Sequence, residues 1–155
     1  MAERLSISEI MDRERALQLL KGSYDSVQRW NRWRQNHSKI PNLQHTDFRN
    51  CNLTDADLSD MNLEKCNFYR VRLVGALLEN ANLSDADLRF ADFDHTRLVN
   101  VRFVRVNFKG TNFCGADLRH ATFKDVNFNQ AECDVHTKWP DGFDPETVGL
   151  NPWPE

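Results

Sequence analysis

One pattern dominates the sequence: from position 43 to position 128, every fifth residue is leucine or phenylalanine. A period of five matches neither the 3.6 residues of a helical turn nor the two-residue alternation of a flat strand. The chain must therefore turn a regular corner once per repeat. Such a fixed period is typical of a solenoid, in which each unit buries its apolar face only against its neighbours. The eighteen central residues are Leu43, Phe48, Leu53, Leu58, Leu63, Phe68, Leu73, Leu78, Leu83, Leu88, Phe93, Leu98, Phe103, Phe108, Phe113, Leu118, Phe123 and Phe128.

The other positions of the repeat also have preferences. The residue two places before the centre is mostly small or apolar, as at Ala56 and Val101. The residue just before the centre is mostly Asn or Asp, as at Asn52 and Asp57, and these types hydrogen-bond locally and tolerate turns. We therefore expect two of the five positions to point inward and the variable polar positions to point outward.

Three runs show the complete repeat: Ala56-Asp57-Leu58-Ser59-Asp60, Ala81-Asn82-Leu83-Ser84-Asp85 and Ala116-Asp117-Leu118-Arg119-His120. They resemble the motif of the pentapeptide-repeat family, and the resemblance extends over about two thirds of the chain. It implies an all-β solenoid, a right-handed quadrilateral β-helix with one repeat per side and four per coil. Eighteen repeats then give about 4.5 coils and a rod ~22 Å long.

We expect one compact domain with three parts: an N-terminal helical cap over residues 1–40, the β-helix over 41–133, and a closing segment over 134–155. Cys133 continues the register but breaks the Leu/Phe rule, so the β-helix is expected to end there. In the closing segment, a Pro-Asp-Gly turn lies between Trp139 and Phe143, which should cover the last coil. Whether Trp153 packs with them is left open.

The first forty residues lack the period of five and predict two helices. Ser6 and Glu9 fit a capping box, and an apolar stripe predicts a helix that ends near Gly22. A second helix is expected over 23–36. The stripe comprises Ile7, Ile10, Met11, Leu17 and Leu20, the buried side of the second helix Val27, Trp30 and Trp33, and its other side Arg29, Arg32 and Arg34.

Two interpretations of these helices remain. An open β-helix exposes unpaired backbone at its first coil, which must be covered to prevent edge pairing, so the helices are expected to be a cap. The segment 29–35 also resembles the leader that precedes the repeats in many cyanobacterial members of the family. The alternative is a DNA-binding helix-turn-helix, because the second helix carries three arginines and two tryptophans.

The four cysteines have no close spacing, which argues against a disulfide framework. Cys51, Cys66 and Cys133 fall on inward positions, and Cys114 on an outward one, so the thiols fit a reducing cytoplasm. Cys133 and His136 alone do not make a zinc site. No signal peptide and no apolar run long enough for a membrane is apparent.

Charge is divided unevenly along the chain. The formal balance is +3 over residues 1–40, −2 over 41–133 and −4 over 134–155, which gives the net −3. A basic head and an acidic tail favour head-to-tail contacts, although such sums more often reflect solvated surface. We therefore expect a monomer or a weak end-to-end dimer.

No feature indicates catalysis. A rod filled with Leu and Phe has no interior pocket, and no phosphate loop, metal-ligand series or nucleophile motif is visible. His45, His95 and His120 fall on three different sides. We therefore expect no enzyme, no catalytic, cofactor-binding or metal residues, and no cofactor. The leading hypothesis is a non-catalytic protein-interaction or scaffold module of the bacterial cytoplasm with an unidentified protein partner.

Two other hypotheses stay open. Some pentapeptide-repeat proteins mimic DNA and bind topoisomerase (gyrase), but the repeats here sum to only −2 and one side is basic. Against nucleic-acid binding through that side stands the net charge of the whole chain, which is acidic. The same side is the candidate partner face, because arginine and aromatic residues are enriched at binding hot spots, although they can also stack within the chain. This basic-aromatic face carries Arg49, Tyr69, Arg70, Arg89, Phe90 and Lys109, and its acidic neighbour Asp55, Asp92, Asp94 and Cys114.

Overall fold

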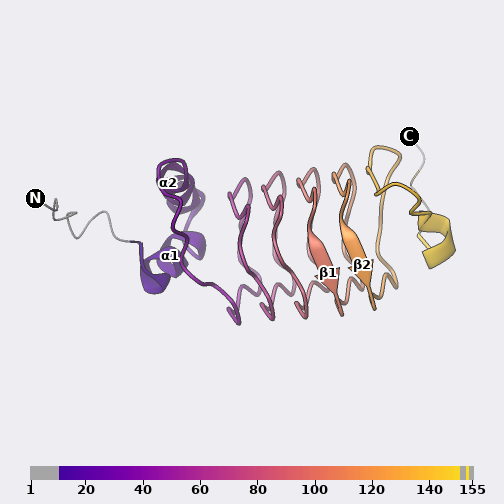
Figure 1. The fold of residues 1–155 in the computed structure, drawn as a ribbon, viewed down its shortest axis with the longest axis horizontal. Helices are drawn as coiled ribbons and strands as arrows, with labels where there is room; N and C mark the ends of the chain where they lie inside the picture. The colour runs from indigo at the N-terminus through magenta and orange to yellow at the C-terminus, as the bar shows by residue number, and fades with distance from the viewer. Residues whose placement is uncertain (1–10, 151–152, 154–155) are drawn as a thin grey trace, which may run out of the picture.

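The computed structural model describes residues 11–150 and Trp153. Two helices come first, α1 (Arg13–Leu20) and α2 (Tyr24–Arg34), followed by the repeats and a short 3₁₀ helix, η1 (Pro145–Val148). Figure 1 shows this order along the long axis of the molecule, with the two α-helices at one end and η1 at the other.

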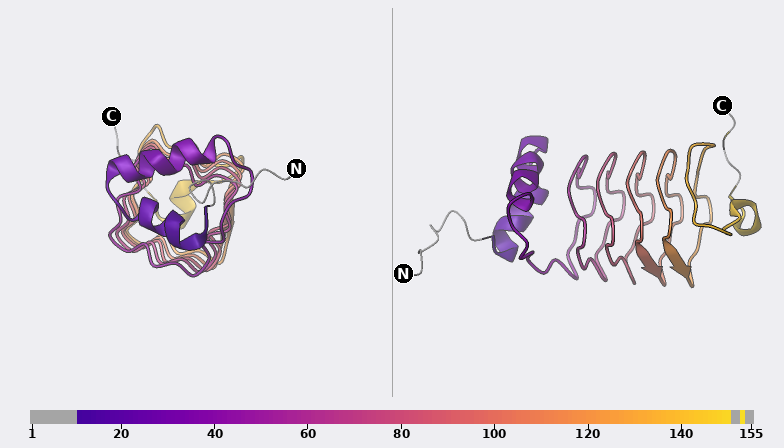
Figure 2. Two further views of the ribbon diagram at one scale, coloured as in Figure 1. Left: turned by 90° about the vertical axis from the view of Figure 1, so that its left-hand side faces the viewer. Right: turned by 45° about the horizontal axis from the view of Figure 1, so that its top comes forward.

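The repeats form the right-handed quadrilateral β-helix that the sequence predicts. Viewed from the N-terminal end, the coils overlie one another as a four-sided tube (Figure 2). Parallel bridges join residues one coil apart, as between Asp47 and Asn67. Among residues 11–150 and Trp153, only β1 (Arg102–Val104) and β2 (Thr122–Lys124) are longer than a single bridge, and they pair in parallel. Most sides hold one bridge because a corner follows every five residues.

Each repeat satisfies its backbone N–H groups in a fixed way. The central N–H donates to the next coil, as from Phe48 to the Asn67 carbonyl at 2.7 Å, while the Asn67 N–H donates back to the Thr46 carbonyl at 2.9 Å. The Asn or Asp before the centre accepts from the N–H two residues on, as Asn67 Oδ1 does from Tyr69 at 3.0 Å. Asn and Asp are therefore preferred at this position because their side chains accept a hydrogen bond from the nearby backbone and so stabilise the corner.

Every corner contains a residue with positive φ, two places after the centre. Fifteen of these residues are not glycine, and their φ angles lie between 53° and 61°. This conformation costs roughly 1–2 kcal/mol for an ordinary L-residue and is easiest for Gly, Asn and Asp. The corner N–H also donates to the next coil, as from Asn50 to the Tyr69 carbonyl at 3.0 Å, so the ladder offsets part of this cost.

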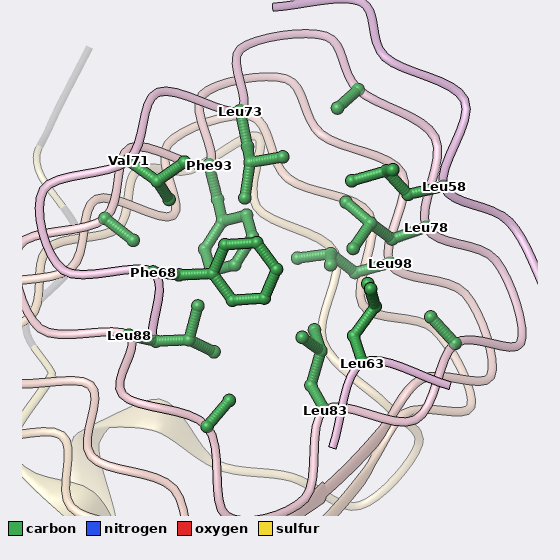
Figure 3. Close-up of a cluster of buried hydrophobic side chains, with 14 of the residues drawn as sticks. Leu58, Leu63, Phe68, Val71, Leu73, Leu78, Leu83, Leu88, Phe93 and Leu98 are labelled. Atoms are coloured by element: carbon green, nitrogen blue, oxygen red, sulfur yellow. The ribbon is translucent and has the colours of Figure 1, made fainter. Parts of the chain in front are cut away.

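The interior is filled by the central residues. All eighteen are buried except Phe123, which is half-buried near the C-terminal end. Figure 3 shows Leu58, Leu78 and Leu98 projecting inward from one side of successive coils. Phenylalanines one coil apart stack, as Phe48 and Phe68 do with ring centroids 5.1 Å apart and planes 5° from parallel.

Polar residues at inward positions are paired to backbone. The buried Thr96 hydroxyl donates to the Leu73 carbonyl at 2.6 Å, and the buried Thr111 hydroxyl donates to the Leu88 carbonyl at 2.7 Å. A threonine can therefore replace alanine or valine there without leaving an unpaired hydroxyl.

The two helices lie across the first coil, as Figure 2 shows. The fully buried Trp30 donates its indole N–H to the Asp57 carbonyl at 2.7 Å. The Asn31 amide donates to the Asp55 carbonyl and accepts from the Asp57 N–H, both at 2.8 Å. Asn31 thus takes the place of a backbone segment of a preceding coil.

Several details of this end differ from the sequence-based expectation. The N-cap of α1 is Asp12, whose carboxylate accepts from the Arg15 N–H at 2.8 Å, whereas Ser6 and Glu9 lie outside the described residues. Arg34 does not point away from the coil: its side chain is 7% exposed and donates to the Ser59 carbonyl at 2.6 Å. The expected burial of Val27 and Trp30 is confirmed, and Trp33 is half-buried.

At the other end, the ladder continues beyond Cys133, where the sequence predicted its end. Lys138 pairs with Asp117, at a spacing one residue longer than the regular coil, so a single residue is inserted into the last side. Trp139 and Phe143 stack with centroids 4.8 Å apart and, as expected, lie against Phe123 and Phe128. The Trp153 backbone N–H donates to the Cys133 carbonyl at 2.9 Å, while its side chain is 58% exposed.

The cysteines are all free thiols. Cys66 and Cys133 are buried, and burial raises the pKa of each to about 11. Cys51 and Cys114 are partly buried, so Cys51 is less enclosed and Cys114 less exposed than their register positions suggested. In the described part of the chain, no helix has the length and apolar character needed to span a bilayer.

Candidate functional site

The basic-aromatic face lies on the side of the tube centred on Phe48, Phe68, Leu88 and Phe108, as the register predicts. Tyr69 and Arg89 follow the centres of two neighbouring coils. Arg70 and Phe90 occupy the adjoining corners, with φ angles of 54° and 58°. Two residue pairs from consecutive coils therefore meet at one edge of this side.

These four residues form an aromatic-arginine cluster, defined as Tyr69, Arg70, Arg89 and Phe90. The Tyr69 and Phe90 rings meet edge to face with centroids 5.7 Å apart. The Arg70 guanidinium carbon lies 5.2 Å from the Tyr69 centroid and 5.9 Å from that of Phe90. The guanidinium carbon of Arg89 lies 5.4 Å from the Tyr69 centroid. The cluster thus holds its own side chains in place by cation-π contacts.

Not every cation of the face is free to meet a partner. Arg49 binds Asp47 through two nitrogens, with Nη2 and Oδ2 2.7 Å apart, and Arg89 binds Asp87 in the same way at 2.6 Å. Hydrogen bonds from Arg49 lower the pKa of Asp47 from 3.8 to about 2, and those from Arg89 lower the pKa of Asp87. Both pairs are local, because the acid lies two residues before the arginine.

Arg70 differs from these two arginines. Among the described residues, neither Arg70 nor Lys109 has a carboxylate within ion-pair distance, as the ion pairs of this face are those of Arg49 and Arg89. Arg70 therefore lies over two aromatic rings without a carboxylate beside it. Lys109 is half-buried further along the face and meets the cluster only through its backbone carbonyl, which accepts from the Phe90 N–H at 2.9 Å. In the described chain, neither Arg49 nor Lys109 takes part in the cation-π contacts of the cluster. The structure thus brings together four of the six residues proposed from the sequence.

Phe90 is an unusual residue for its position. Corners favour Gly, Asn and Asp, and a bulky residue with positive φ is rare. Its side chain is nevertheless 41% exposed. The ring lies against Gly110 of the next coil, where a Cβ would come within 2.5 Å of Phe90 Cδ1. Gly110 thus leaves the space that Phe90 occupies.

Sequence reasoning missed three contributors to this face: Asp47, Asp87 and Gly110. A signal for the acids was present, because Asp-Phe-Arg at 47–49 and Asp-Leu-Arg at 87–89 repeat the same spacing. Asp117 and Arg119 form the same pair on another side at 2.7 Å. The role of Gly110 depends on the residue that lies one coil earlier, Phe90. It can be recognised only when the number of residues per coil is known.

The acidic neighbouring side is partly occupied by internal contacts. Tyr24 of α2 donates to the Asp55 carboxylate at 3.0 Å, and Asn112 donates to Asp92 at 3.0 Å. Burial, followed by nearby carboxylates, raises the pKa of the Cys114 thiol. In residues 11–150 and Trp153, no group of three or more His, Cys, Asp or Glu side chains could hold a metal ion.

The helical end offers little for reading a DNA groove. In α2, Trp30 is buried and both Trp30 and Arg34 bond to backbone of the first coil. Arg29 and Arg32 are exposed. The Trp30 indole N–H and the Arg34 Nη2 group therefore bind the first coil and are not available to contact bases.

The chain belongs to the pentapeptide-repeat family. The model described as "Pentapeptide repeats" matches eight copies, over residues 41–68, 66–103 and 102–132. The chain is similar to a pentapeptide repeat protein from the thylakoid lumen of Arabidopsis thaliana, with 28% identity and a TM-score of 0.59. That match covers 61% of this chain and 66% of the other, so the chain spans slightly less than two thirds of that relative.

A second relative is a pentapeptide repeat protein from Nostoc Pcc 7120, with 27% identity, a TM-score of 0.52, and coverage of 66% of this chain and 84% of the other. QnrB1, a plasmid-mediated fluoroquinolone resistance protein, is 20% identical over 74% of this chain and 83% of its own, with a TM-score of 0.38. A search of curated proteins gave no significant match. The matches indicate no enzymatic family.

Proposed function

We propose that this protein is a non-catalytic interaction or scaffold module that binds a protein partner through the aromatic-arginine cluster. The observation that carries the proposal is Phe90, an exposed aromatic residue held at a corner whose φ of 58° disfavours it. Residues that break a local structural rule are expected mainly at functional sites. Arg70, charged and without a carboxylate partner in the described chain, adds a polar anchor beside it.

The physical basis of binding is pre-organisation. Tyr69 and Phe90 are fixed edge to face, and Arg70 stacks on both, so little side-chain freedom remains to be lost. Aromatic residues and arginine contribute most of the energy at many interfaces. The same stacking also stabilises the chain itself, so a test must separate binding from stability.

Phe90→Asn provides that separation. Asparagine suits positive φ, so the variant is expected to be as stable as the wild type or more stable while losing the partner. Arg70→Glu should also lose it. Arg72→Glu is the matched control, because Arg72 is an exposed arginine on the neighbouring side with no ion pair among the described residues. Affinity purification from the native cell would measure partner recovery for each folded variant.

Recovery of every specific partner at wild-type yield with both Phe90→Asn and Arg70→Glu would rule out this face. Loss with Arg72→Glu as well would show a general charge effect. The cytoplasmic location belongs to the proposal and is checked by cell fractionation, since the Arabidopsis relative comes from the thylakoid lumen.

The gyrase-binding alternative gains no support from the charge arrangement. Five aspartates of the repeats are paired with arginine, so the tube has no unbroken acidic side comparable with a duplex. They are Asp47, Asp57, Asp85, Asp87 and Asp117. A supercoiling assay with gyrase and a salt-dependent DNA titration distinguish the two alternatives from the proposal.

A further inference from the structure

The C-terminal edge of the rod differs from every coil before it. In the preceding coil, the Val106 carbonyl accepts a hydrogen bond from the last coil at 3.1 Å. The N–H groups of Phe108 and Gly110 donate to the last coil at 2.8 and 3.0 Å. One carbonyl and two N–H groups thus pair on this side of the tube.

The equivalent groups one coil later are the Val126 carbonyl and the N–H groups of Phe128 and Gln130. No described residue pairs with any of the three. At the opposite end of the rod, on the side centred on Leu58, the side chains of Trp30 and Asn31 bond to the backbone of Asp55 and Asp57. No such cover lies over Val126–Gln130 among the described residues, so this segment is an unpaired strand edge.

This edge faces a groove. The last coil, Val126–Gln130, forms one wall, and Val148 and Gly149 at the end of η1 form the other. None of these residues is charged, and Val148 is 42% exposed. The groove therefore combines two N–H donors, one carbonyl acceptor and an apolar wall, which suits an uncharged extended backbone.

A second copy of the rod fits poorly here. Figure 1 shows η1 beyond the last coil, and Figure 2 shows it within the outline of the tube. Trp139 and Phe143 fill the interior over Phe128, with centroids 6.1 and 5.8 Å away. The coil of another rod cannot stack flush against this end, whereas a single extended segment can lie in the groove beside η1.

We propose that the groove binds an uncharged, extended segment of a partner protein, which adds to Val126–Gln130 as a further strand. This site is separate from the aromatic-arginine cluster and does not depend on it.

The test uses the full chain and a defined probe, the acetylated and amidated peptide Ser-Val-Ala-Val-Ser, titrated to millimolar concentration in NMR spectra. The amide signals of Phe128 and Gln130 should shift and become protected from exchange. Those of Phe108 and Gly110, already paired, should not. The same peptide with N-methylated backbone should leave all four unchanged, because it cannot pair as a strand.

Two valine variants at the same end of the rod test whether the peptide binds against the wall formed by Val148 and Gly149. Val148→Arg should weaken peptide binding about tenfold, by removing an apolar contact and filling the groove. Val135→Arg, at a valine that is 52% exposed and outside the groove, should leave it unchanged. Unshifted Phe128 and Gln130 signals, equal binding of the N-methylated peptide, or equal loss with both variants would each overturn the proposal. Shifts that depend on protein concentration without peptide would assign the edge to a second copy.

Discussion

Replacing Asn31 by alanine tests how the helices close the rod. The Asn31 amide makes two hydrogen bonds of 2.8 Å, to the Asp55 carbonyl and from the Asp57 N–H. Alanine removes both and leaves these two backbone groups to water or unpaired. The side chain is small and half-buried, so little apolar contact is lost with it.

The expected loss follows from these contacts. A net ~0.5–1.5 kcal/mol for each hydrogen bond gives a loss of up to ~3 kcal/mol. Alanine gains up to ~0.7 kcal/mol of helix propensity within α2. The free energy of unfolding should therefore fall by about 1–2 kcal/mol, which lowers the Tm by about 2–8 °C for a chain of this size.

Urea and thermal unfolding of Asn31→Ala measure this loss, with Arg32→Ala as the control. Arg32 is the next residue of α2, is exposed and has no side-chain bond within the described chain, so its change should stay within ~0.5 kcal/mol. Equal stability of the two variants would refute the reasoning, because it would mean that the helices do not satisfy the first coil through Asn31.

Leu83→Ala should cost ~2–5 kcal/mol in urea titrations because Leu83 is fully buried between coils, while Arg102→Ala, at an exposed neighbour, stays within ~0.5 kcal/mol; equal losses would show a wrong register. Asp47, whose pKa is lowered from 3.8 to about 2, should contribute stability above pH 4 that is lost as pH falls toward 2; Asp47→Asn should therefore show a smaller drop in Tm over that window, and an unchanged drop would contradict it. Cys66 and Cys133, with pKa values of about 11, should react with a thiol reagent at neutral pH only after unfolding, and mass spectrometry of the alkylated protein would reveal any earlier reaction.

The buried hydroxyl of Ser84 shows where sequence reasoning needed the structure. By register Ser84 is an outward position beside Leu83, but its side chain is buried and its hydroxyl donates to Asn82 Oδ1 at 2.6 Å. Replacing Ser84 is therefore a poor control for Leu83→Ala in the unfolding experiment. Arg102→Ala is the better control because Arg102 is exposed. A position in the repeat indicates a direction, but burial also depends on the side chains one coil away.

The repeat itself was predictable because each unit follows the same local rules. The five-residue period dictates the corner, and the Asn or Asp before the centre closes its own turn. The ends were less predictable because they depend on contacts between distant segments. The hydrogen bonds of Asn31 with the backbone of Asp55 and Asp57 leave no periodic signal in the sequence. The residue inserted before Lys138 leaves none either.

The candidate site was predictable in composition but not in arrangement. The register placed Tyr69, Arg70, Arg89 and Phe90 on one side, where the structure has them. It did not show that Arg89 forms an ion pair with Asp87, whereas Arg70 has no carboxylate partner in the described chain. That difference depends on side-chain conformation, which a repeat pattern does not determine.

The most direct test of the interaction function is site-specific photo-crosslinking in the cell that naturally produces the protein. A photoreactive phenylalanine analogue would replace Phe90 in one variant and Val99, on a different side of the tube, in another. The account predicts a discrete covalent adduct with a protein partner from position 90 and none from position 99. The absence of an adduct at position 90, or the same adducts from both positions, would contradict it.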